Sequence, residues 1–488
     1  MSRTDTHDVI VVGGGPAGAV MAWALAGRGL RVAVIERATF PREKVCGDFV
    51  EPGGLRILDA MGCLRTLGAS LPITSTRVYF GPRLAYLGDI PYYEAAHGAP
   101  THGYIVPRHR LDAQLLECAA AASADVRQGC AAMGMVREDG LVHVSVREGE
   151  REHVLSAPMV VGADGTESVV ARSAGLRRTD RRHIGLSQRA YVEGVEVEGG
   201  EATIWFDEDL YPGYGWMFPM PGGRANVGAG LLSETCHRQG LSITEAFAAV
   251  LEKLRVRHPG CGKLKLVSRP LGGAVKMYGG IDRNHFDGGL LIGDAGSFVD
   301  PMTGEGITQG MESALIAAST IVDALEAGRF DADFLARYET DFRAYFDPAM
   351  AFLELCAASM RNWHLRDFWL RATYRGFEEA RGDPDFARVS GAAFGGLGVR
   401  PLAIVQQVWS KIFAYVGRDG ATAMLRGLGG GAGGLLGDLQ CLERGWRASL
   451  SEDPRWHFSW LADVVKASAR AQASLWTPDN PRVLGPLA

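Results

Sequence analysis

The chain has 488 residues, of which 47% are hydrophobic and 22% charged, a composition typical of a globular protein with a large buried core. Its 51 basic and 56 acidic residues give a net charge of −5, which argues against a nucleic-acid partner because nucleic-acid-binding proteins are usually basic. The length allows roughly two or three domains.

The eight cysteines contain no C-x-x-C pair, so we predict no metal site and no disulfide framework. This distribution of cysteines favours a protein of the reducing cytoplasm. Residues 9–25 are apolar, but four glycines and a proline interrupt them, so we do not expect a signal peptide. No uninterrupted apolar run approaches the roughly 20 residues that a membrane span needs.

The first predicted elements form a nucleotide-binding unit. Residues 8–12 (DVIVV) have the pattern of a buried parallel strand, and a helical segment over residues 19–29 follows the turn GGGPAG. A second strand, residues 31–36, ends at Glu36. The turn fits G-x-G-x-x-G, and an acid about 20 residues later is placed to accept ribose hydroxyls. A glycine turn without a ligand is the alternative.

Each glycine of this turn has a physical role. Gly13 permits the tight turn, Gly15 lets the backbone approach a pyrophosphate, and Gly18 lets the helix pack closely on the strand. The helix N-terminus offers free N–H groups and a partial positive charge to the phosphates.

The next segment, PREKVCGDFVEPGG (residues 41–54), places Cys46 between Lys44 and the pair Gly47-Asp48. A thiol with its usual pKa of about 8.5 is mostly protonated at pH 7 and can act as an acid. Cys46 is therefore a candidate to donate a proton, to position a water or to border a cavity. A small residue packed under a cofactor is the simpler alternative, and Lys44 and Asp48 are then loop charges.

Two later segments are strands that run into acidic turns. Residues 160–168 (VVGADGTES) lead into Asp164, and residues 288–318 lead through Gly293-Asp294 and a loop into an apolar helix. Gly304 and Gly306 precede that helix, whose N-terminal partial charge would stabilise an anionic ring. Each segment alone is also compatible with an ordinary strand-to-helix turn.

An aromatic strand lies between these two segments. In YGWMFPMPGGRANVGAG (residues 214–230), period-two alternation puts Tyr214, Trp216 and Phe218 on one face. Gly228 and Gly230 on the return strand lack side chains, which predicts space beside the rings for a flat or greasy ligand. The alternative is that the rings are sheet core.

The order of these motifs resembles that of FAD-dependent oxidoreductases of the para-hydroxybenzoate hydroxylase type. The resemblance implies that Asp294 holds the ribityl chain of FAD and that Arg108 lies near the ribityl and pyrophosphate groups, with Asp112 supporting the adjoining helix. The pattern Y-x-W-x-F-P-x8-G-x-G and the segment K-x-C-G-D further resemble the geranylgeranyl reductase family. This second resemblance covers residues from about 8 to 325.

The resemblance implies an α/β fold in which a Rossmann-like FAD-binding domain is interleaved with an antiparallel-sheet substrate domain and followed by a mainly helical C-terminal region. We assign residues 1–75, 100–180 and 280–330 to the FAD domain, 76–99 and 181–279 to the substrate domain, and 331–488 to the helical region. The predicted cofactor-binding residues are Gly13, Gly15, Pro16, Ala17, Gly18, Glu36, Arg37, Lys44, Cys46, Arg108, Asp164, Gly293, Asp294, Pro301, Gly304, Gly306 and Ile307. The predicted catalytic residues are Cys46, Gly47 and Asp48, and the predicted substrate-binding residues are Tyr214, Trp216, Phe218, Pro219, Gly228 and Gly230.

The activity that this implies is reduction of C=C bonds in an isoprenoid or similarly hydrophobic substrate, with hydride from flavin N5 and electrons from NAD(P)H or a ferredoxin. The alternative is an FAD-dependent monooxygenase, a hydroxylase or a halogenase. Halogenases typically carry W-x-W-x-I-P, whereas this chain has Tyr214 and Phe218. A third class, Rab GDP-dissociation inhibitors, uses a related fold without FAD, and the full phosphate cradle argues against it.

Residues 329–488 are alanine-rich, and we expect them to be mostly helical. Their helices are candidates to cap a substrate tunnel, to form a dimer face, to touch a membrane surface peripherally, or simply to pack on the core. Residues 427–437 (GLGGGAGGLLG) are too glycine-rich for a stable helix, so we predict a loop there.

Overall fold

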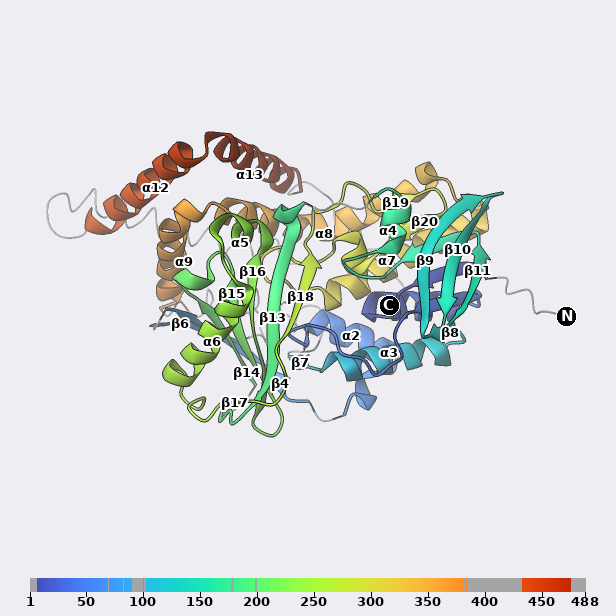
Figure 1. The fold of residues 1–488 in the computed structure, drawn as a ribbon, viewed down its shortest axis with the longest axis horizontal. Helices are drawn as coiled ribbons and strands as arrows, with labels where there is room; N and C mark the ends of the chain where they lie inside the picture. Colours follow the sequence, from blue (N-terminus) through green and yellow to red (C-terminus); the bar gives the residue numbers. More distant parts are fainter. Residues whose placement is uncertain are drawn as a thin grey trace.

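The computed structural model describes residues 7–474 except 69, 82, 90–99, 101, 177–179, 198–199, 381 and 384–431. The chain forms two bodies side by side, each built on its own sheet, with helices of the C-terminal part lying along one edge (Figure 1). For residues 384–431, which include the apolar segment 401–416, the expectation of helical structure lies outside the described residues.

The first body contains a six-stranded sheet in the order β19-β20-β12-β1-β2-β8, parallel except for its edge strand β19. Its strands are β1 (Val9–Val12), β2 (Val32–Glu36), β8 (Asp125–Gln128), β12 (Met159–Gly162), β19 (His285–Phe286) and β20 (Gly289–Leu291). They come from three separate parts of the chain, so this body is discontinuous in sequence.

Continuous apolar runs such as VIVV in β1 occur because both faces of this sheet are covered. Val9 and Val11 pack with the helices on one face, whereas Ile10 and Val12 pack on the other against a three-stranded antiparallel sheet. The helices are α1 (Pro16–Ala26), α2 (Pro52–Ala60), α3 (Arg108–Ala121) and α7 (Ile307–Ala327). The covering sheet is β9 (Cys130–Glu138), β10 (Leu141–Glu148) and β11 (Arg151–Ala157), and the short helix α4 (Val169–Ser173) lies beside it.

The second body is an eight-stranded sheet in which most neighbours are antiparallel. Its strands are β5 (Ser75–Phe80), β6 (Arg83–Asp89), β13 (Ile184–Glu193), β14 (Glu201–Phe206), β15 (Tyr214–Met220), β16 (Arg224–Leu232), β17 (Lys265–Leu266) and β18 (Leu271–Lys276). The β5–β14 pair is parallel, a departure from the fully antiparallel expectation. It arises because these two strands belong to different passes of the chain and are not joined by a hairpin.

Helices α5 (Ser233–Gln239) and α6 (Ile243–Arg257) follow the hairpin of β15 and β16, and α6 packs its buried residues on the sheet. A small sheet of β3 (Phe49–Val50), β4 (Pro72–Ile73) and β7 (Gly103–Ile105) belongs to the segment that connects the two bodies. The limits that we assigned to the domains stay a prediction, although the strand order groups the same segments.

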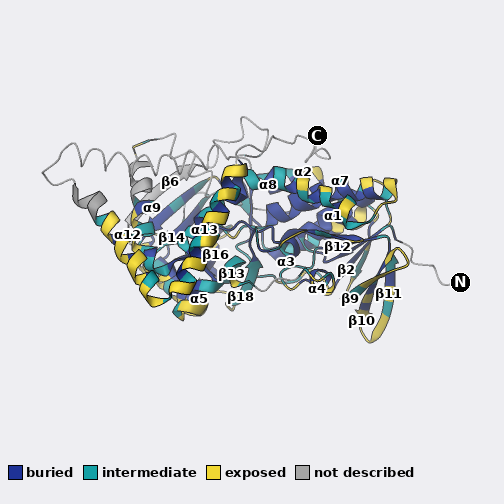
Figure 2. Cartoon of the chain, turned by 90° about the horizontal axis from the view of Figure 1, so that it is seen from above, coloured by how far each residue is buried: buried dark blue, intermediate teal, exposed yellow. Residues whose placement is uncertain are grey.

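The C-terminal part is helical: α8 (Ala332–Met360), α9 (Arg366–Ala380), α12 (Ala432–Glu452) and α13 (Pro454–Ser474). The prediction of a loop over residues 427–437 was wrong from Ala432 onward, since α12 begins there. The outer faces of α12 and α13 are exposed (Figure 2), whereas the sheets beneath are buried. Among the described helices, none is both long enough and apolar enough to cross a membrane.

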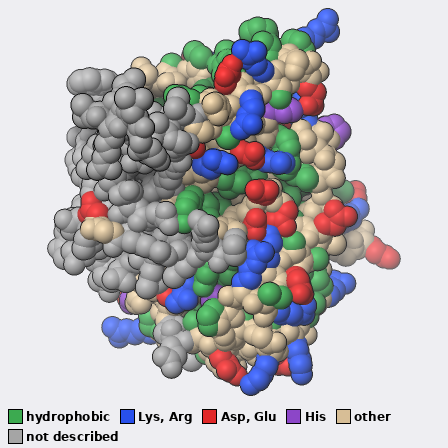
Figure 3. Space-filling view, turned by 90° about the vertical axis from the view of Figure 1, so that its left-hand side faces the viewer, with side chains coloured by type: hydrophobic (Ala, Val, Ile, Leu, Met, Phe, Trp, Pro, Cys, Tyr) green, Lys and Arg blue, Asp and Glu red, His purple; other side chains and the backbone are tan. Residues whose placement is uncertain are grey.

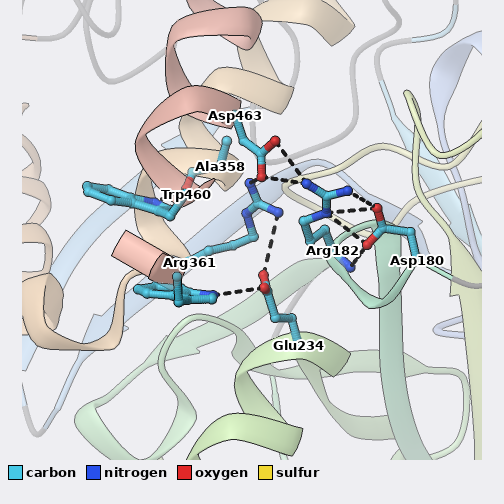
Figure 4. A network of polar contacts seen from close by, with 8 residues as sticks. Asp180, Arg182, Glu234, Ala358, Arg361, Trp460 and Asp463 are labelled. Carbon is cyan, nitrogen blue, oxygen red and sulfur yellow. Dashed lines mark hydrogen bonds and ion pairs between the residues drawn. The ribbon is translucent and has the colours of Figure 1, made fainter. Parts of the chain in front are cut away.

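Helix α13 is fastened to the rest of the molecule by a group of ion pairs (Figure 4). Asp463 accepts hydrogen bonds from Arg182, at 2.8 and 2.9 Å, and from Arg361, at 3.2 Å. Arg361 is 6% exposed and also pairs with Glu234, and Trp460 donates its Nε1–H to the Ala358 carbonyl at 2.9 Å. This clamp joins α13 to α8, α5 and the start of β13.

Candidate active site

A cavity of about 570 Å³ lies where the two bodies meet. It begins at the carboxyl ends of β1 and β2, the usual ligand position in open α/β sheets, and ends at the aromatic strand β15. A cavity of this size is within the range of cofactor and small-molecule sites.

The glycine turn forms the narrow end of the cavity. Gly13 has φ +107°, and a Cβ there would lie 2.3 Å from the Ala163 carbonyl oxygen, so the turn requires glycine. At Gly15 a Cβ would meet only Arg42 Nη2, at 3.7 Å, so this position is open toward the cavity. Gly18 does not line the cavity; a Cβ there would lie 1.9 Å from the Gly13 carbonyl oxygen, which allows α1 to pack closely.

Glu36 is held at the end of β2 by backbone donors. Its Oε2 accepts from the Gly14 N–H at 2.8 Å, and its Oε1 accepts from the Ala38 N–H at 2.8 Å. The carboxylate is 6% exposed and lines the cavity. A buried carboxylate fixed by amides at this position fits the ribose of a dinucleotide.

Positive charge faces the cradle from two arginines that share one acid. Arg108 donates to both oxygens of Asp112, at 2.7 and 2.9 Å, and Arg42 lies 3.0 Å from the same carboxylate. Asp112 is fully buried, and the Nη1 of Arg42 is a buried donor with no hydrogen-bond partner among the described residues. Two guanidinium groups against one carboxylate leave a net positive charge, which fits a pyrophosphate.

The two late acidic turns converge on the same cavity. Asp164 Oδ2 accepts from the N–H of Val169 at 2.6 Å, and burial raises the pKa of this carboxyl. Asp294 lines the cavity, and Thr166 donates to its Oδ2 at 3.5 Å. The glycine cradle, the paired arginines and these acids together fit FAD, which when bound supplies a hydride from its reduced flavin ring.

The segment with Cys46 lies beside the aromatic strand, and a buried network ties the two together. Asn226 on β16 donates from Nδ2 to the Cys46 carbonyl and to Asp48 Oδ2, both at 2.9 Å. Its Oδ1 accepts from Trp216 Nε1 at 3.0 Å, and Tyr191 donates to Asp48 Oδ2 at 2.6 Å. One side chain therefore fixes both the backbone of the cysteine loop and the orientation of an aromatic ring.

Asp48 is fully buried and has φ +65°, an uncommon conformation for a residue other than glycine. Burial raises its pKa to about 6, although the hydrogen bonds from Tyr191 and Asn226 and the positive charge of Arg189 each lower that pKa. Burial also raises the pKa of the Cys46 thiol, against the charge of Arg108. The thiol is therefore neutral at physiological pH.

The aromatic end of the cavity is formed by Tyr214, Trp216 and Phe218, which all line it. Trp216 lies opposite Gly228 in the ladder, and a Cβ at Gly228 would be 2.1 Å from the Trp216 ring. The expected gap at Gly228 is thus filled by Trp216 itself, and this glycine does not line the cavity.

Of the predicted site residues, all but Gly18, Pro219 and Gly228 line the cavity. The sequence reasoning missed the groups that depend on long-range contacts. These are Arg42 at the cradle, Phe49 and Phe206 at the aromatic end, Glu305 beside the cofactor loop, and Tyr191 and Asn226 in the network. Arg42 lies within the segment of residues 41–54, and Glu305 lies between Gly304 and Gly306. A charged side chain inside each of these motifs is the signal that could have identified them.

Comparison with known proteins agrees with this geometry. A family model described as an FAD binding domain matches residues 6–205. Digeranylgeranylglycerophospholipid reductase 2 of Methanothermobacter thermautotrophicus is 33% identical over 347 residues, which cover 69% of this chain and 83% of the relative. Menaquinone reductase of Mycobacterium tuberculosis is 31% identical over 353 residues, covering 70% and 83%.

Solved structures share the fold. A geranylgeranyl bacteriochlorophyll reductase-like protein from Thermoplasma acidophilum superimposes with a TM-score of 0.65 at 24% identity, covering 83% of this chain and 99% of that one. A flavin-dependent brominase reaches 0.64 at 18% identity, with the same coverage. At these identities the likeness concerns the fold alone.

Proposed function

The chain belongs to the geranylgeranyl reductase family of FAD-dependent oxidoreductases, and from that premise we propose that it saturates C=C bonds of a prenyl chain or a similarly hydrophobic substrate. The observation that carries the proposal is the cavity itself, which has a phosphate cradle at one end and an aromatic wall at the other. The relatives named above for digeranylgeranylglycerophospholipid and for menaquinone support the same substrate class.

The residues at the two ends of the cavity have different roles. Glu36, the glycine turn, Arg108 and Asp294 hold the cofactor, while the three aromatic residues of β15 exclude water and orient the substrate chain. An isolated alkene accepts hydride poorly unless a proton is delivered to its other carbon. Cys46, Gly47 and Asp48 stand at the aromatic end and form the catalytic segment.

The decisive test is a single-turnover experiment without oxygen. Photoreduced holoenzyme is mixed with a geranylgeranylated lipid, and the flavin absorption is followed as the substrate oxidises it. A reductase recovers the oxidised spectrum and yields a saturated product. If the spectrum recovers only when oxygen is admitted and an oxygenated or halogenated product appears, the monooxygenase alternative is correct.

The same assay tests the cysteine. Cys46→Ser nearly keeps the shape of the side chain and Cys46→Ala shortens it by one atom, and both remove the thiol. Loss of substrate-dependent reoxidation in both, at wild-type flavin content, makes the thiol a participant. Unchanged rates would show that the thiol only packs against the cofactor.

The electron donor is NAD(P)H or a ferredoxin in our proposal. The described part of the chain has one glycine cradle of the dinucleotide type, and the FAD pyrophosphate takes it, so a nicotinamide would visit the flavin transiently. Anaerobic bleaching of the flavin by NADPH, NADH or a reduced ferredoxin, each tried alone, identifies the donor.

We further propose a cytoplasmic protein that touches the membrane peripherally through α12 and α13. These helices expose Leu439, Trp446, Phe458 and Val465, which are 51%, 37%, 61% and 60% accessible. Figure 3 shows the side of the molecule on which α12 lies in Figure 1, and among the described residues there acidic and basic side chains are intermixed. Cosedimentation with lipid vesicles, lost in Phe458→Ser combined with Val465→Ser, tests this contact.

A further inference from the structure

A buried and a partly exposed carboxyl group meet behind the loop that precedes α7. Glu305 belongs to that loop and lines the cavity, whereas Glu51 is the N-cap residue of α2 and is 1% exposed. Glu51 does not cap its own helix with its side chain. Its carboxyl group instead forms a hydrogen bond with that of Glu305 and accepts from Gln309 Nε2, at 3.3 Å to each oxygen.

A hydrogen bond between two carboxyl groups requires that one of them carries the proton. None of the ion pairs found among the described residues involves Glu51 or Glu305. The charged group facing Glu305 from its own loop is Asp300, another acid, whose Oδ1 accepts from the N–H groups of Met302 and Thr303. The pair therefore retains a proton at neutral pH, because two adjacent carboxyl groups without a cation resist ionising together, and a pair that has lost its proton readily takes one back.

The other groups that surround the pair are neutral. From α7, Thr308 and Gln309 contact Glu51, and Thr303 donates to Glu305 Oε2 at 3.2 Å. Gln309 is 3% exposed, and its Oε1 is a buried acceptor with no partner among the described residues. The unpaired Gln309 Oε1 therefore offers a binding position for a proton donor or a water next to the carboxyl pair.

Glu305 also lies where the cofactor loop meets the substrate wall. Tyr214 donates its hydroxyl to the Thr303 carbonyl in the same loop. Glu305, Tyr214 and Cys46 line the same cavity. Burial raises the pKa of the Tyr214 hydroxyl, and the nearby carboxyl group of Glu305 adds to this rise. Arg108 also lines this cavity, but it is paired with Asp112.

Burial raises the pKa of both glutamates. The hydrogen bond between them raises the pKa of Glu51 further and opposes the rise at Glu305, so Glu51 stores the proton of the pair and passes it to Glu305, whose pKa Asp300 also raises. Burial likewise raises the pKa of Cys46, which makes the thiol a weaker acid than it is in water. An efficient general acid has a pKa near the working pH, and a raised carboxyl pKa approaches that condition whereas a raised thiol pKa departs from it.

We propose that Glu305 is the acid that delivers the proton to the substrate carbon, with Glu51 sharing that proton between turnovers. The assignment rests on the proposed function. One alkene carbon receives hydride, with its two electrons, from the reduced cofactor, and the other carbon receives the proton from Glu305. The C=C bond becomes a C–C single bond with two new C–H bonds, and the pair is left as two carboxylates. Solvent restores the proton through the cavity.

Three isosteric variants test the assignment in the reduced holoenzyme. Glu305→Gln removes the proton donor, Glu51→Gln removes the partner, and Glu312→Gln is the matched control. Glu312 is a buried glutamate of α7 that accepts from Tyr345 at 2.7 Å and does not line the cavity. Each variant is compared with wild type for flavin content, for the infrared band of a protonated carboxyl group, and for anaerobic reoxidation by a geranylgeranylated lipid.

We expect the wild-type reoxidation rate to fall as the pH rises above neutrality, because the pair then loses its proton. Glu305→Gln should be about 100-fold slower and should lose this pH dependence. Glu51→Gln should keep its rate at low pH with the fall shifted to lower pH, since its amide donates to the ionised Glu305. Glu312→Gln should match wild type in the pH profile.

The proposal is overturned if Glu305→Gln keeps the wild-type rate and pH profile, or if the infrared band of the pair persists unchanged in Glu51→Gln. It is also overturned if Cys46→Ala, and not Glu305→Gln, abolishes the pH dependence. Failure of wild type to react with any prenyl substrate would instead refute the proposed function. The infrared band, which needs no substrate, then still decides whether the pair holds a proton.

Discussion

Replacing Asp48 by Asn should stabilise the protein at neutral pH. Burial raises the pKa of Asp48 in the folded protein to about 6, whereas an aspartate in an unfolded chain titrates near 3.8. A difference of about 2 units corresponds to about 3 kcal/mol of unfolding free energy. The amide keeps an oxygen to accept from Tyr191 and Asn226, and Asn tolerates the positive φ of this position.

The sign follows from proton linkage. Below about pH 4 Asp48 is protonated in both states, and the native environment that favours the neutral form contributes its full stability. As the pH rises from about 4 to 6 the unfolded chain ionises first, so this contribution is lost, and above pH 6 the folded protein bears a buried carboxylate. Asp48→Asn cannot ionise, so its advantage over wild type should be near zero at pH 4 and about 3 kcal/mol at pH 7.

Urea unfolding followed by circular dichroism at pH 4 and pH 7 measures this difference. Asp112→Asn is the matched control, because it neutralises a buried aspartate that pairs with Arg42 and Arg108. That variant should be less stable than wild type at pH 7 by about 3 to 5 kcal/mol, since it leaves buried cations uncompensated. The reasoning about Asp48 is refuted if Asp48→Asn is no more stable than wild type at pH 7.

Three further predictions concern the cradle, the aromatic wall and the clamp. Gly15→Val should fold, because its side chain meets only open cavity, but should be purified without flavin absorption; a coloured variant would contradict the cradle. Gly228→Ala should cost about 1 to 3 kcal/mol in stability and raise the KM for the lipid, because its Cβ displaces Trp216, whereas Gly230→Ala, with only a 3.7 Å contact, should do neither. Asp463→Asn should accelerate amide hydrogen exchange in α13, since two arginines lose their partner; unchanged exchange would show that apolar contacts alone hold the helix.

The cofactor half of the site could be predicted from sequence because its chemistry is local. Gly13 must adopt a positive φ, and Glu36 must follow a short buried strand, and both requirements are visible within 25 residues. Strands β1, β2, β12 and β20 follow from apolar runs of the same kind, whereas β8 and the antiparallel edge strand β19 have no such run. The parallel pairing of β5 with β14 could not be predicted, because no local sequence pattern specifies which distant strand a given strand will pair with.

The substrate half was less predictable because its side chains are placed by distant partners. The alternation in β15 predicts the face on which Trp216 lies. Trp216 is paired with Gly228 on β16, however, so the Trp216 ring itself occupies the space that this glycine leaves. Glu51 looks like an ordinary helix N-cap in the sequence. Its role becomes visible only when α7 brings Glu305 and Gln309 against it, more than 250 residues later.

Asn226 shows why the two halves must be considered together. Its amide reaches a carbonyl 180 residues earlier in the chain and, through its oxygen, a ring on the neighbouring strand. A shift of the Trp216 ring would therefore also disturb the hydrogen bond to the Cys46 carbonyl, because one amide group makes both bonds. The Cys46 segment and the aromatic strand are thus tied together by a single side chain, and neither can be placed from its local sequence alone.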